Sequence, residues 1–560
     1  MRLPIGYSDF RQLRREGFDY VDKTGLVVEI VRSTAQVFCF PRPRRFGKTL
    51  NLSMLRYWFE RTDEARGDLY AGLAVASAGD DVAATFQRHP TVFLTFKDVK
   101  HRDWPACRAD MAGLIQTEAD RLRPVWESAP LTDSERVSLT TIVVGTATDT
   151  DLHGSLRLLT RALHLATGQR AVLLIDEYDT PIHAGWGGGY YDEVIGFFRN
   201  LLSSGLKDNA HLYRGVLTGI LRVAKESVFS GLNNVSVYTV LSSPFSAWFG
   251  FTEPEVQALC DAAGPGVDVQ GLRTWYNGYQ MGDTVVYNPW SVLRYLSNPA
   301  GGFQPYWVNT ASHDLLRSLL VEGGMGLHDD LALLMRGGVV EASISETINL
   351  RDLPKSVATV WSFLLFSGYL KAASTRWDDG RLYAVLAIPN REVRTSYQDM
   401  FLTWLELGVG SESSARALGG ALLSGDAETF EGLLQRLIVE SLSFFDAHRR
   451  TPEAVYQAFL VGLFIHLDAT HIVDSNRESG FGRYDVCVQP RTPGRPGAVL
   501  ELKSYDATRW SAPDLALDAA MGQLRDRAYA TRLRQAGADP VWQWGAVFDG
   551  KRVFVRVEAG

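Results

Sequence analysis

The run Gly47-Lys48-Thr49 has the residue types that bind the phosphates of a nucleotide. In a loop of this kind the backbone N–H groups converge on the phosphates, the lysine neutralises their charge, and the hydroxyl coordinates Mg²⁺. The complete motif also has a glycine five residues ahead of Gly47, and this chain has Arg42 there. The match is therefore partial and needs support from a second motif.

The second motif is the apolar run from Ala171 to Ile175, which is followed by Asp176 and Glu177. The run predicts a buried strand, whose end would bring Asp176 to the Mg²⁺ ion and Glu177 to the water that attacks the γ-phosphate. A strand that ends in two acidic residues is by itself common on protein surfaces. Together with the first motif it predicts that the chain binds ATP and hydrolyses it.

Several other residues are candidates for contacts with the nucleotide. Arg42, Arg44 and Arg45 lie in the loop and would add positive charge around the triphosphate, or form a solvated basic turn. Thr218 ends another predicted strand, where a hydroxyl can contact the γ-phosphate, and Arg222 follows closely as a second phosphate contact. The alternative for this second pair is a helix cap and a surface ion pair.

A second group of residues, near the C-terminus, has the pattern of a metal-dependent nuclease. Glu501 and Lys503 share one face of a predicted strand, while Leu500 and Leu502 occupy the opposite, apolar face. Charges on a buried strand are costly unless a metal or a substrate compensates them. Asp485 precedes the neighbouring strand, so two carboxylates would hold Mg²⁺ or Mn²⁺ while the lysine activates the attacking water.

The elements around these three residues are predicted to bring them together. The segment Arg491–Gly497 is rich in proline and glycine and would form the turn of a hairpin between the two strands. Gln523 and Tyr529 lie on a predicted helix that would cover the site. The alternative is that Glu501 and Lys503 form an ion pair with a structural role only.

The nucleotide motifs require a strand that leads directly into a helix. Val37–Phe40 is a short apolar strand, and apolar residues recur at helical spacing over Leu50–Trp58. Further strands are predicted at Thr91–Phe96, Ala171–Ile175 and Tyr213–Leu217, with helical segments between them. This alternation predicts an α/β fold with a largely parallel sheet.

Changes in composition along the chain predict three regions. Residues 1–250 would form the ATPase domain. Glycine, proline and asparagine interrupt short aromatic-rich pieces after residue 250, so residues 251–440 would form a lid or winged part followed by mostly helices. Residues 441–560 would form a compact α/β domain.

The composition predicts a folded protein without a general affinity for polyanions. Of the 560 residues, 46% are apolar and 22% are charged, and the formal net charge is −7. Basic and acidic residues also nearly balance in the C-terminal region, so any contacts with nucleic acid would be local. Four widely spaced cysteines favour buried thiols over disulfides or a zinc site, and neither a signal peptide nor a membrane span is predicted. We therefore expect a cytoplasmic protein that makes no contact with membranes.

Eight stretches are specific enough to indicate a family. They are Tyr20–Thr24, Arg42–Thr49, Leu174–Ile182, Thr218–Ser227, Phe229–Asn234, Trp275–Tyr279, Tyr287–Trp290 and Ser475–Asp485. On these residues the chain resembles the bacterial and archaeal AAA-ATPase-like proteins that carry a C-terminal PD-(D/E)XK nuclease domain. The resemblance spans nearly the whole chain and implies a P-loop ATPase with a parallel sheet, joined to a restriction-endonuclease-like α/β domain.

The resemblance also implies roles for single residues. Lys48 and Thr49 would bind phosphate and Mg²⁺, and Asp176 and Glu177 would serve hydrolysis. Arg42 is a usual replacement for the loop glycine in this family.

In the C-terminal domain, the resemblance implies a nuclease site made of Asp485, Glu501 and Lys503. Gln523 and Tyr529 match the helix that follows the second strand in the family. Glu478 lies ahead of the aspartate, where such nucleases often have another acidic residue.

Two functions remain open at this level. The first is an ATP-regulated, Mg²⁺-dependent nuclease that cuts nucleic acid, with DNA favoured over RNA. The second is a nucleotide-switched protein that binds nucleic acid or a protein partner and does not cut. The oligomeric state and the coupling between the two sites cannot be predicted from these patterns.

Overall fold

The computed structural model describes two compact units of the chain. The described residues are 1–222, 232–307, 324–335, 337–353, 356–397, 412–442, 456–457, 460–461, 463–464, 467, 470–474, 478–479, 482–507, 509–526, 529–550 and 552–560. The first unit contains Met1–Thr310 with Glu341–Val393, and the second contains Ala311–Val340 with Arg394–Gly560. Within the described part, no helix combines the length and apolar character needed to cross a membrane.

The first unit contains a five-stranded sheet in the order β2-β3-β4-β1-β5, and every neighbouring pair is parallel. Its strands are β1 (Val37–Pro41), β2 (Thr91–Thr95), β3 (Ala171–Asp176), β4 (Leu212–Gly219) and β5 (Val235–Val237). β1 and β3 are buried along their whole length, as expected for parallel strands covered on both faces. The predicted parallel α/β sheet is confirmed, and β5 is a strand that the pattern did not predict.

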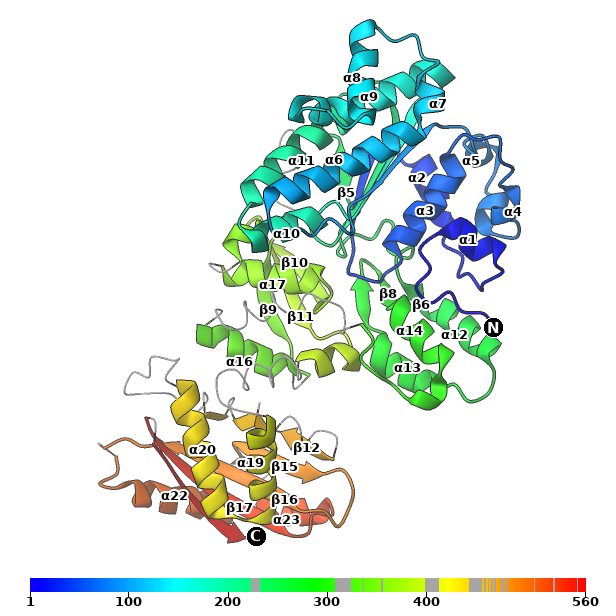
Figure 1. Cartoon of the computed structure of the whole chain (residues 1–560). Coiled ribbons are helices and arrows are strands. Elements are labelled where there is room, and N and C mark those ends of the chain that lie inside the picture. Colours follow the sequence, from blue (N-terminus) through cyan, green and yellow to red (C-terminus); the bar gives the residue numbers. More distant parts are fainter. Residues whose placement is uncertain are drawn as a thin grey trace. The chain divides into compact units, whose positions relative to one another are not determined.

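Helices cover both faces of this sheet (Figure 1). The helical elements up to the end of α11 are α1 (Phe10–Arg15), α2 (Gly25–Arg32), α3 (Lys48–Phe59), α4 (Gly67–Tyr70), η1 (Ala74–Ser77), α5 (Asp80–Ala83), α6 (Trp104–Arg121), α7 (Arg123–Trp126), α8 (Asp133–Val143), α9 (Asp149–Thr167), α10 (Thr180–Gly188) and α11 (Tyr191–Leu206). Figure 1 shows α6, α9 and α11 on one side of the strands and α2 and α3 on the other. α8 and α9 each begin with a capping box, in which a threonine side chain and an acidic side chain satisfy the first free N–H groups.

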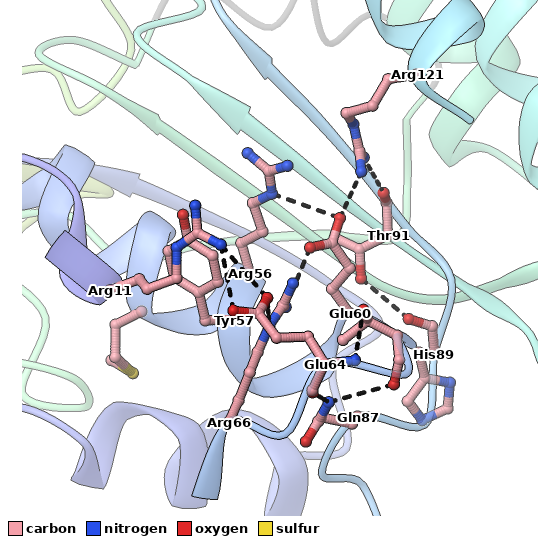
Figure 2. Close-up of polar contacts among 12 residues, drawn as sticks. Arg11, Arg56, Tyr57, Glu60, Glu64, Arg66, Gln87, His89, Thr91 and Arg121 are labelled. Atoms are coloured by element: carbon pink, nitrogen blue, oxygen red, sulfur yellow. Dashed lines mark hydrogen bonds and ion pairs between the residues drawn. The ribbon is translucent and has the colours of Figure 1, made fainter. Parts of the chain in front are cut away.

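A buried carboxylate joins the end of α3 to α6 (Figure 2). Glu60 forms ion pairs with Arg56, Arg66 and Arg121, with nitrogen–oxygen distances of 3.5, 3.1 and 2.6 Å, respectively. Burial alone would raise the pKa of Glu60, but the three arginines outweigh it and hold that pKa below its ordinary value. The network fixes α3, which begins at Lys48, onto the rest of the unit.

The remainder of the first unit contains two small sheets, ordered β6-β8-β7 and β10-β11-β9. Its elements are β6 (Phe251–Thr252), α12 (Glu253–Ala263), α13 (Val269–Tyr276), β7 (Tyr279–Met281), β8 (Thr284–Tyr287), α14 (Pro289–Ser297), η2 (Pro299–Gly301), β9 (Val340–Ile344), η3 (Leu350–Asp352), α17 (Val357–Phe366), β10 (Lys371–Asp378) and β11 (Arg381–Ala387). The sequence predicted mostly helices after residue 310 and missed the second sheet. Most of β10 is exposed, so it lacks the apolar alternation that predicts a strand.

The second unit contains a mixed sheet in the order β12-β15-β16-β17-β18. Its elements are α16 (Gly324–Met335), α19 (Glu412–Ser424), α20 (Ala427–Leu442), β12 (His471–Asp474), β13 (Glu478–Ser479), β14 (Gly482–Arg483), β15 (Val486–Pro490), β16 (Gly497–Ser504), α22 (Pro513–Asp526), α23 (Tyr529–Gln535), β17 (Val541–Asp549) and β18 (Arg552–Ala559). Residues of α19 and α20 pack on one face of the sheet, and residues of α22 and α23 pack on the other. The predicted C-terminal α/β domain is confirmed.

Candidate functional site

The loop between β1 and α3, residues 42–47, surrounds the side chain of Lys48. The ammonium group of Lys48 donates to the carbonyl oxygens of Arg42 at 3.2 Å and Pro43 at 3.1 Å, and the residue is only 3% exposed. Gly47 has φ +81°, a left-handed conformation that glycine adopts without strain, and α3 begins at the next residue. The amine thus lies at a helix N-terminus, where backbone N–H groups also favour an anion.

Asp176, at the end of β3, accepts hydrogen bonds from three hydroxyl groups. Thr49 donates at 2.8 Å, Thr218 at 2.6 Å and Thr95 at 3.2 Å. Burial raises the pKa of Asp176 above its ordinary value, although the bonds from Thr218 and Thr49 act in the opposite direction. A carboxylate beside a hydroxyl is an oxygen donor set that suits Mg²⁺, so these residues fit the ion that the sequence predicts.

Glu177 lies beside the lysine at the same edge of the sheet. Its Oε1 is 3.9 Å from the ammonium nitrogen of Lys48, and its Oε2 accepts a hydrogen bond from Thr180 at 3.0 Å. Its backbone has φ +50°, which is uncommon for a residue other than glycine. The carboxyl ends of β1, β3 and β4 therefore bring together Lys48, Thr49, Asp176, Glu177 and Thr218.

A cavity of about 310 Å³ adjoins this group. Lys48, Thr49 and Glu177 line one part of it. Large apolar side chains, including Trp248 and Trp290, line another part. A mainly apolar cavity with a few charged groups at one end has the character of a small-molecule site.

The second group of predicted residues lies on one face of the sheet in the second unit. Leu500 and Leu502 pack with α19 and α20, whereas Val499 packs with α22 and α23. Strand alternation therefore places Glu501 and Lys503 on the face covered by α22 and α23. Their side chains form an ion pair of 2.9 Å, and the Glu501 side chain is 2% exposed.

Asp485 directly precedes β15 and lies next to this pair. Val486 pairs with Leu500 in the antiparallel ladder, so continuing the register by one residue puts Asp485 opposite Glu501. One carboxylate oxygen of Asp485 accepts from the backbone N–H of Leu502 at 2.7 Å. The other is a candidate metal ligand.

The donor set at this second site fits a hard divalent cation that keeps several waters. Mg²⁺ in proteins is commonly held by one or two carboxylates with water completing the shell. In the described part of the chain, no cluster of three or more His, Cys, Asp or Glu residues could form a cage made only of protein ligands. Asp485 and Glu501 therefore suit Mg²⁺ or Mn²⁺ better than a structural zinc ion.

Comparison with known proteins finds a family model that matches each region. Residues 4–229 match the family described as predicted AAA-ATPase, and residues 451–558 match the PD-(D/E)XK nuclease superfamily. The chain therefore joins a region that is similar to predicted AAA-ATPases to a C-terminal region that is similar to PD-(D/E)XK nucleases. The chain is also similar to an uncharacterized protein in the vnfD 5′ region of Azotobacter chroococcum mcd 1. The two sequences are 28% identical over 558 residues, and the aligned part covers 98% of this chain and 96% of that protein.

The three arginines of the loop in the AAA-ATPase-like region have different positions. Arg45 lines the cavity, with its guanidinium group 4.2 Å from the Trp290 ring. Arg42 is fully buried, donates to the carbonyl of Tyr238 at 2.5 Å, and has its pKa lowered to about 9 by burial. Neither Arg42 nor Arg44 is one of the described residues that line the cavity. The structure therefore brings Arg45, but neither of the other two side chains, to the cavity.

Arg222 and Glu478 are the two remaining predicted site residues. Arg222 lies after β4, and its carbonyl accepts from the N–H of Ile348 at 3.0 Å. Parts of three stretches of the resemblance, at residues 223–227, 229–231, 475–477 and 480–481, lie outside the described residues. Glu478 forms the short strand β13 with Ser479.

The predicted helical cover of the nuclease domain is present as two helices. Gln523 is on α22, and the buried Tyr529 begins α23. The Tyr529 ring packs edge-on against the Tyr484 ring, with centroids 5.6 Å apart. Tyr529 therefore packs against the residue that directly precedes Asp485 in the chain.

Asp179 is a residue of the AAA-ATPase-like region that sequence reasoning missed. It is buried, and its Oδ2 accepts from the backbone N–H groups of Ile220 at 2.8 Å and Leu221 at 2.9 Å. The preceding residue, Tyr178, donates its hydroxyl to the carbonyl of Leu221 at 2.5 Å. The segment after Glu177 thus holds the segment after Thr218. A third acidic residue so close to Asp176 and Glu177 was the available signal.

We expect Asp179→Ala to destabilise the first unit. Each buried N–H that loses its acceptor costs about 1–3 kcal/mol, so two of them should lower the free energy of unfolding by about 2–6 kcal/mol. Asp179→Asn keeps an acceptor oxygen and should lose less than half as much. Thermal denaturation followed by circular dichroism measures both variants. Equal melting temperatures for Asp179→Ala and the parent would contradict this account of the segment.

Proposed function

We propose that the chain binds Mg²⁺ and ATP in its AAA-ATPase-like region, hydrolyses the nucleotide, and thereby regulates a metal-dependent nuclease in its C-terminal domain. One observation carries the proposal. Lys48, Thr49, Asp176 and Glu177 come from two motifs far apart in the sequence, and they meet beside one cavity. The joining of such a site to a PD-(D/E)XK nuclease domain in one chain supports a shared task.

In the ATPase-like region each residue has a distinct part. Lys48 would exchange its bonds to the loop carbonyls for bonds to the β- and γ-phosphates. Thr49 and Asp176 would hold Mg²⁺, which when bound neutralises charge on the phosphates. Glu177 would orient the attacking water and accept its proton. Thr218 keeps the Asp176 carboxylate in place through its bond of 2.6 Å.

In the nuclease domain the face covered by α22 and α23 would hold the scissile phosphate. Asp485 and Glu501 would bind Mg²⁺ or Mn²⁺, which when bound stabilises the negative charge of the transition state. Lys503 would position the attacking water and share in that stabilisation. DNA remains the favoured substrate over RNA.

A second function is supported by the ion pair in the nuclease domain. A contact of 2.9 Å between Lys503 and the buried Glu501 is also what a purely structural pair would form. In that case the chain would bind nucleic acid or a protein partner under control of the nucleotide, without cutting. Cleavage assays on site variants separate the two functions.

Nucleotide binding can be tested through the tryptophans of the cavity. Because Trp248 and Trp290 line it, titration of the purified full chain with ATP and Mg²⁺ should change tryptophan fluorescence and saturate. Release of inorganic phosphate under the same conditions tests hydrolysis. An unchanged fluorescence signal, together with no binding by calorimetry, would contradict the proposed ATP site.

A further inference from the structure

A helical segment ahead of the nuclease strands packs against the sheet of the second unit. Among residues 456–463, those that the structure describes are all helical. The described apolar side chains of this segment belong to the same buried cluster as Leu500 and Leu502 of β16. Because side chains alternate along a strand, the segment lies on the face of the sheet opposite to Glu501 and Lys503.

Gln457 reaches from this segment to Asp485. It is only 6% exposed, and its side-chain Nε2 donates to the carbonyl oxygen of Asp485 at 2.6 Å. This carbonyl belongs to the peptide group that joins Asp485 to Val486, the first residue of β15. One carboxylate oxygen of the same aspartate accepts from the backbone N–H of Leu502 at 2.7 Å. Asp485 is therefore held at two points, its main chain by Gln457 and its side chain by β16.

Packing alone does not account for a glutamine in this place. The neighbouring side chains of the segment, Tyr456 and Leu460, belong to the apolar cluster. Burying an amide group costs free energy unless hydrogen bonds compensate, whereas an apolar side chain of similar size has no such cost. The bond to the Asp485 carbonyl supplies compensation, so the polarity of Gln457 is connected with Asp485 and not with the core.

The adjacent residue, Tyr456, makes a comparable bond to a residue that is not a proposed metal ligand. Its ring stacks on the Phe548 ring of β17, with centroids 3.9 Å apart, and its hydroxyl donates to the carbonyl of Gly550 at 2.9 Å. Tyr456 and Gln457 thus each join the segment to one backbone carbonyl. Comparing them separates an effect on Asp485 from the attachment of the segment to the sheet.

We propose that Gln457 is a positioning residue, which orients Asp485 for the divalent ion of the nuclease site. The inference rests on the proposed nuclease function. Leu502 engages one oxygen of the Asp485 carboxylate, so the direction of the other oxygen depends on how the main chain of Asp485 is held. The bond from Gln457 fixes that direction. Groups that orient a metal ligand without touching the ion typically contribute about 10- to 100-fold in metal affinity or activity.

The test measures Mn²⁺ binding by Gln457→Met in the full chain, without nucleotide. Methionine has nearly the same length as glutamine and no donor group. Electron paramagnetic resonance measures bound Mn²⁺, and the ion that the parent binds but Asp485→Asn does not is assigned to the nuclease site. We expect the Kd of this ion to rise at least about 10-fold in Gln457→Met. The Mn²⁺ concentration for half-maximal cleavage should rise by about the same factor, while the rate at saturating Mn²⁺ stays within about 3-fold of the parent rate.

Tyr456→Phe is the matched control, because it removes the bond to Gly550 from the adjacent residue and keeps the ring on Phe548. It should lower the melting temperature of the second unit, as Gln457→Met does, but leave the Kd for Mn²⁺ unchanged. If Gln457→Met does not fold, Gln457→Asn tests the same bond. Its amide is one carbon shorter and falls short of the Asp485 carbonyl, so it should show the same rise in Kd.

The outcomes separate this inference from the function on which it rests. Equal Mn²⁺ binding by the parent and Asp485→Asn would contradict the proposed metal site itself. Absence of cleavage by the parent would contradict the proposed nuclease and leave the Mn²⁺ affinities as the test of Gln457. With the metal site present, a parent-like Kd in the Gln457 variants, or an equal rise in Tyr456→Phe, would overturn the positioning role alone.

Discussion

Lys48→Ala will abolish nucleotide binding by the first unit. Lys48 is the buried cation inside the loop, where it donates to the carbonyls of Arg42 and Pro43. Its removal leaves the triphosphate without its main charge-assisted partner, so the Kd for ATP should rise at least about 100-fold, which corresponds to about 2.8 kcal/mol. Calorimetric titration with ATP and Mg²⁺ measures the change.

Glu177→Gln should have the opposite profile. The glutamine leaves Lys48 and Asp176 in place, so ATP should bind with nearly the parent affinity. It cannot accept the proton of the attacking water, so turnover should fall about 100-fold or more. Lys207→Ala is the control. Lys207 follows α11 and lies in the loop that leads to the start of β4, away from Thr218 at its end, so this change should alter neither the ATP affinity nor the turnover. Parent affinity for ATP in Lys48→Ala would contradict the assignment of the loop.

Asp485→Asn and Glu501→Gln will each remove metal-dependent cleavage while ATP hydrolysis continues. Asp485 directly precedes β15, Glu501 lies on the neighbouring strand β16, and the candidate nucleotide residues all belong to the first unit. A neutral amide is a much weaker ligand for Mg²⁺ than a carboxylate, so cleavage should fall at least about 100-fold. Phosphate release should stay within about 2-fold, because neither substitution changes a residue of the proposed ATP site, which belongs to the first unit.

The structural alternative makes a different forecast for the same residues. If Glu501 and Lys503 are only an ion pair, breaking the pair should lower the melting temperature without changing any metal-dependent activity. Lys503→Ala should instead slow cleavage and leave metal affinity intact, if the lysine acts on the water. Glu558→Gln, which breaks an exposed pair with Arg525, is the matched control and should leave cleavage unchanged. Cleavage at the parent rate in Asp485→Asn would remove the catalytic assignment.

Local patterns predicted where many of the candidate residues of both sites lie in the fold. Lys48 and Asp176 follow buried apolar strands, and the parallel sheet brings those strand ends together. Side chains alternate between the two faces of a strand, which predicted that Glu501 and Lys503 share one face. Leu500 and Leu502 pack on the opposite face, as this alternation requires. These predictions depended only on neighbours in the sequence.

Other features depend on contacts between segments that are distant in the sequence. The direction of the Arg42 side chain is set by the carbonyl of Tyr238, which a sequence pattern does not place beside it. Asp179 and Gln457 matter because of the backbone groups that they hold, and buried polar residues of this kind carry no periodic signal. The short strand β5 and the exposed strand β10 likewise lack the apolar patterns that indicate strands.

The central claim is that one chain couples a nucleotide site to a nuclease, and a cleavage assay tests it most directly. The purified full chain is incubated with single- and double-stranded DNA and RNA, with and without ATP, in Mg²⁺, Mn²⁺ or EDTA. Our account predicts cleavage that needs the metal, that ATP changes in the parent but not in Lys48→Ala, and that is absent in Asp485→Asn. Intact substrates under every condition, or equal cleavage by the parent and Asp485→Asn, would contradict it.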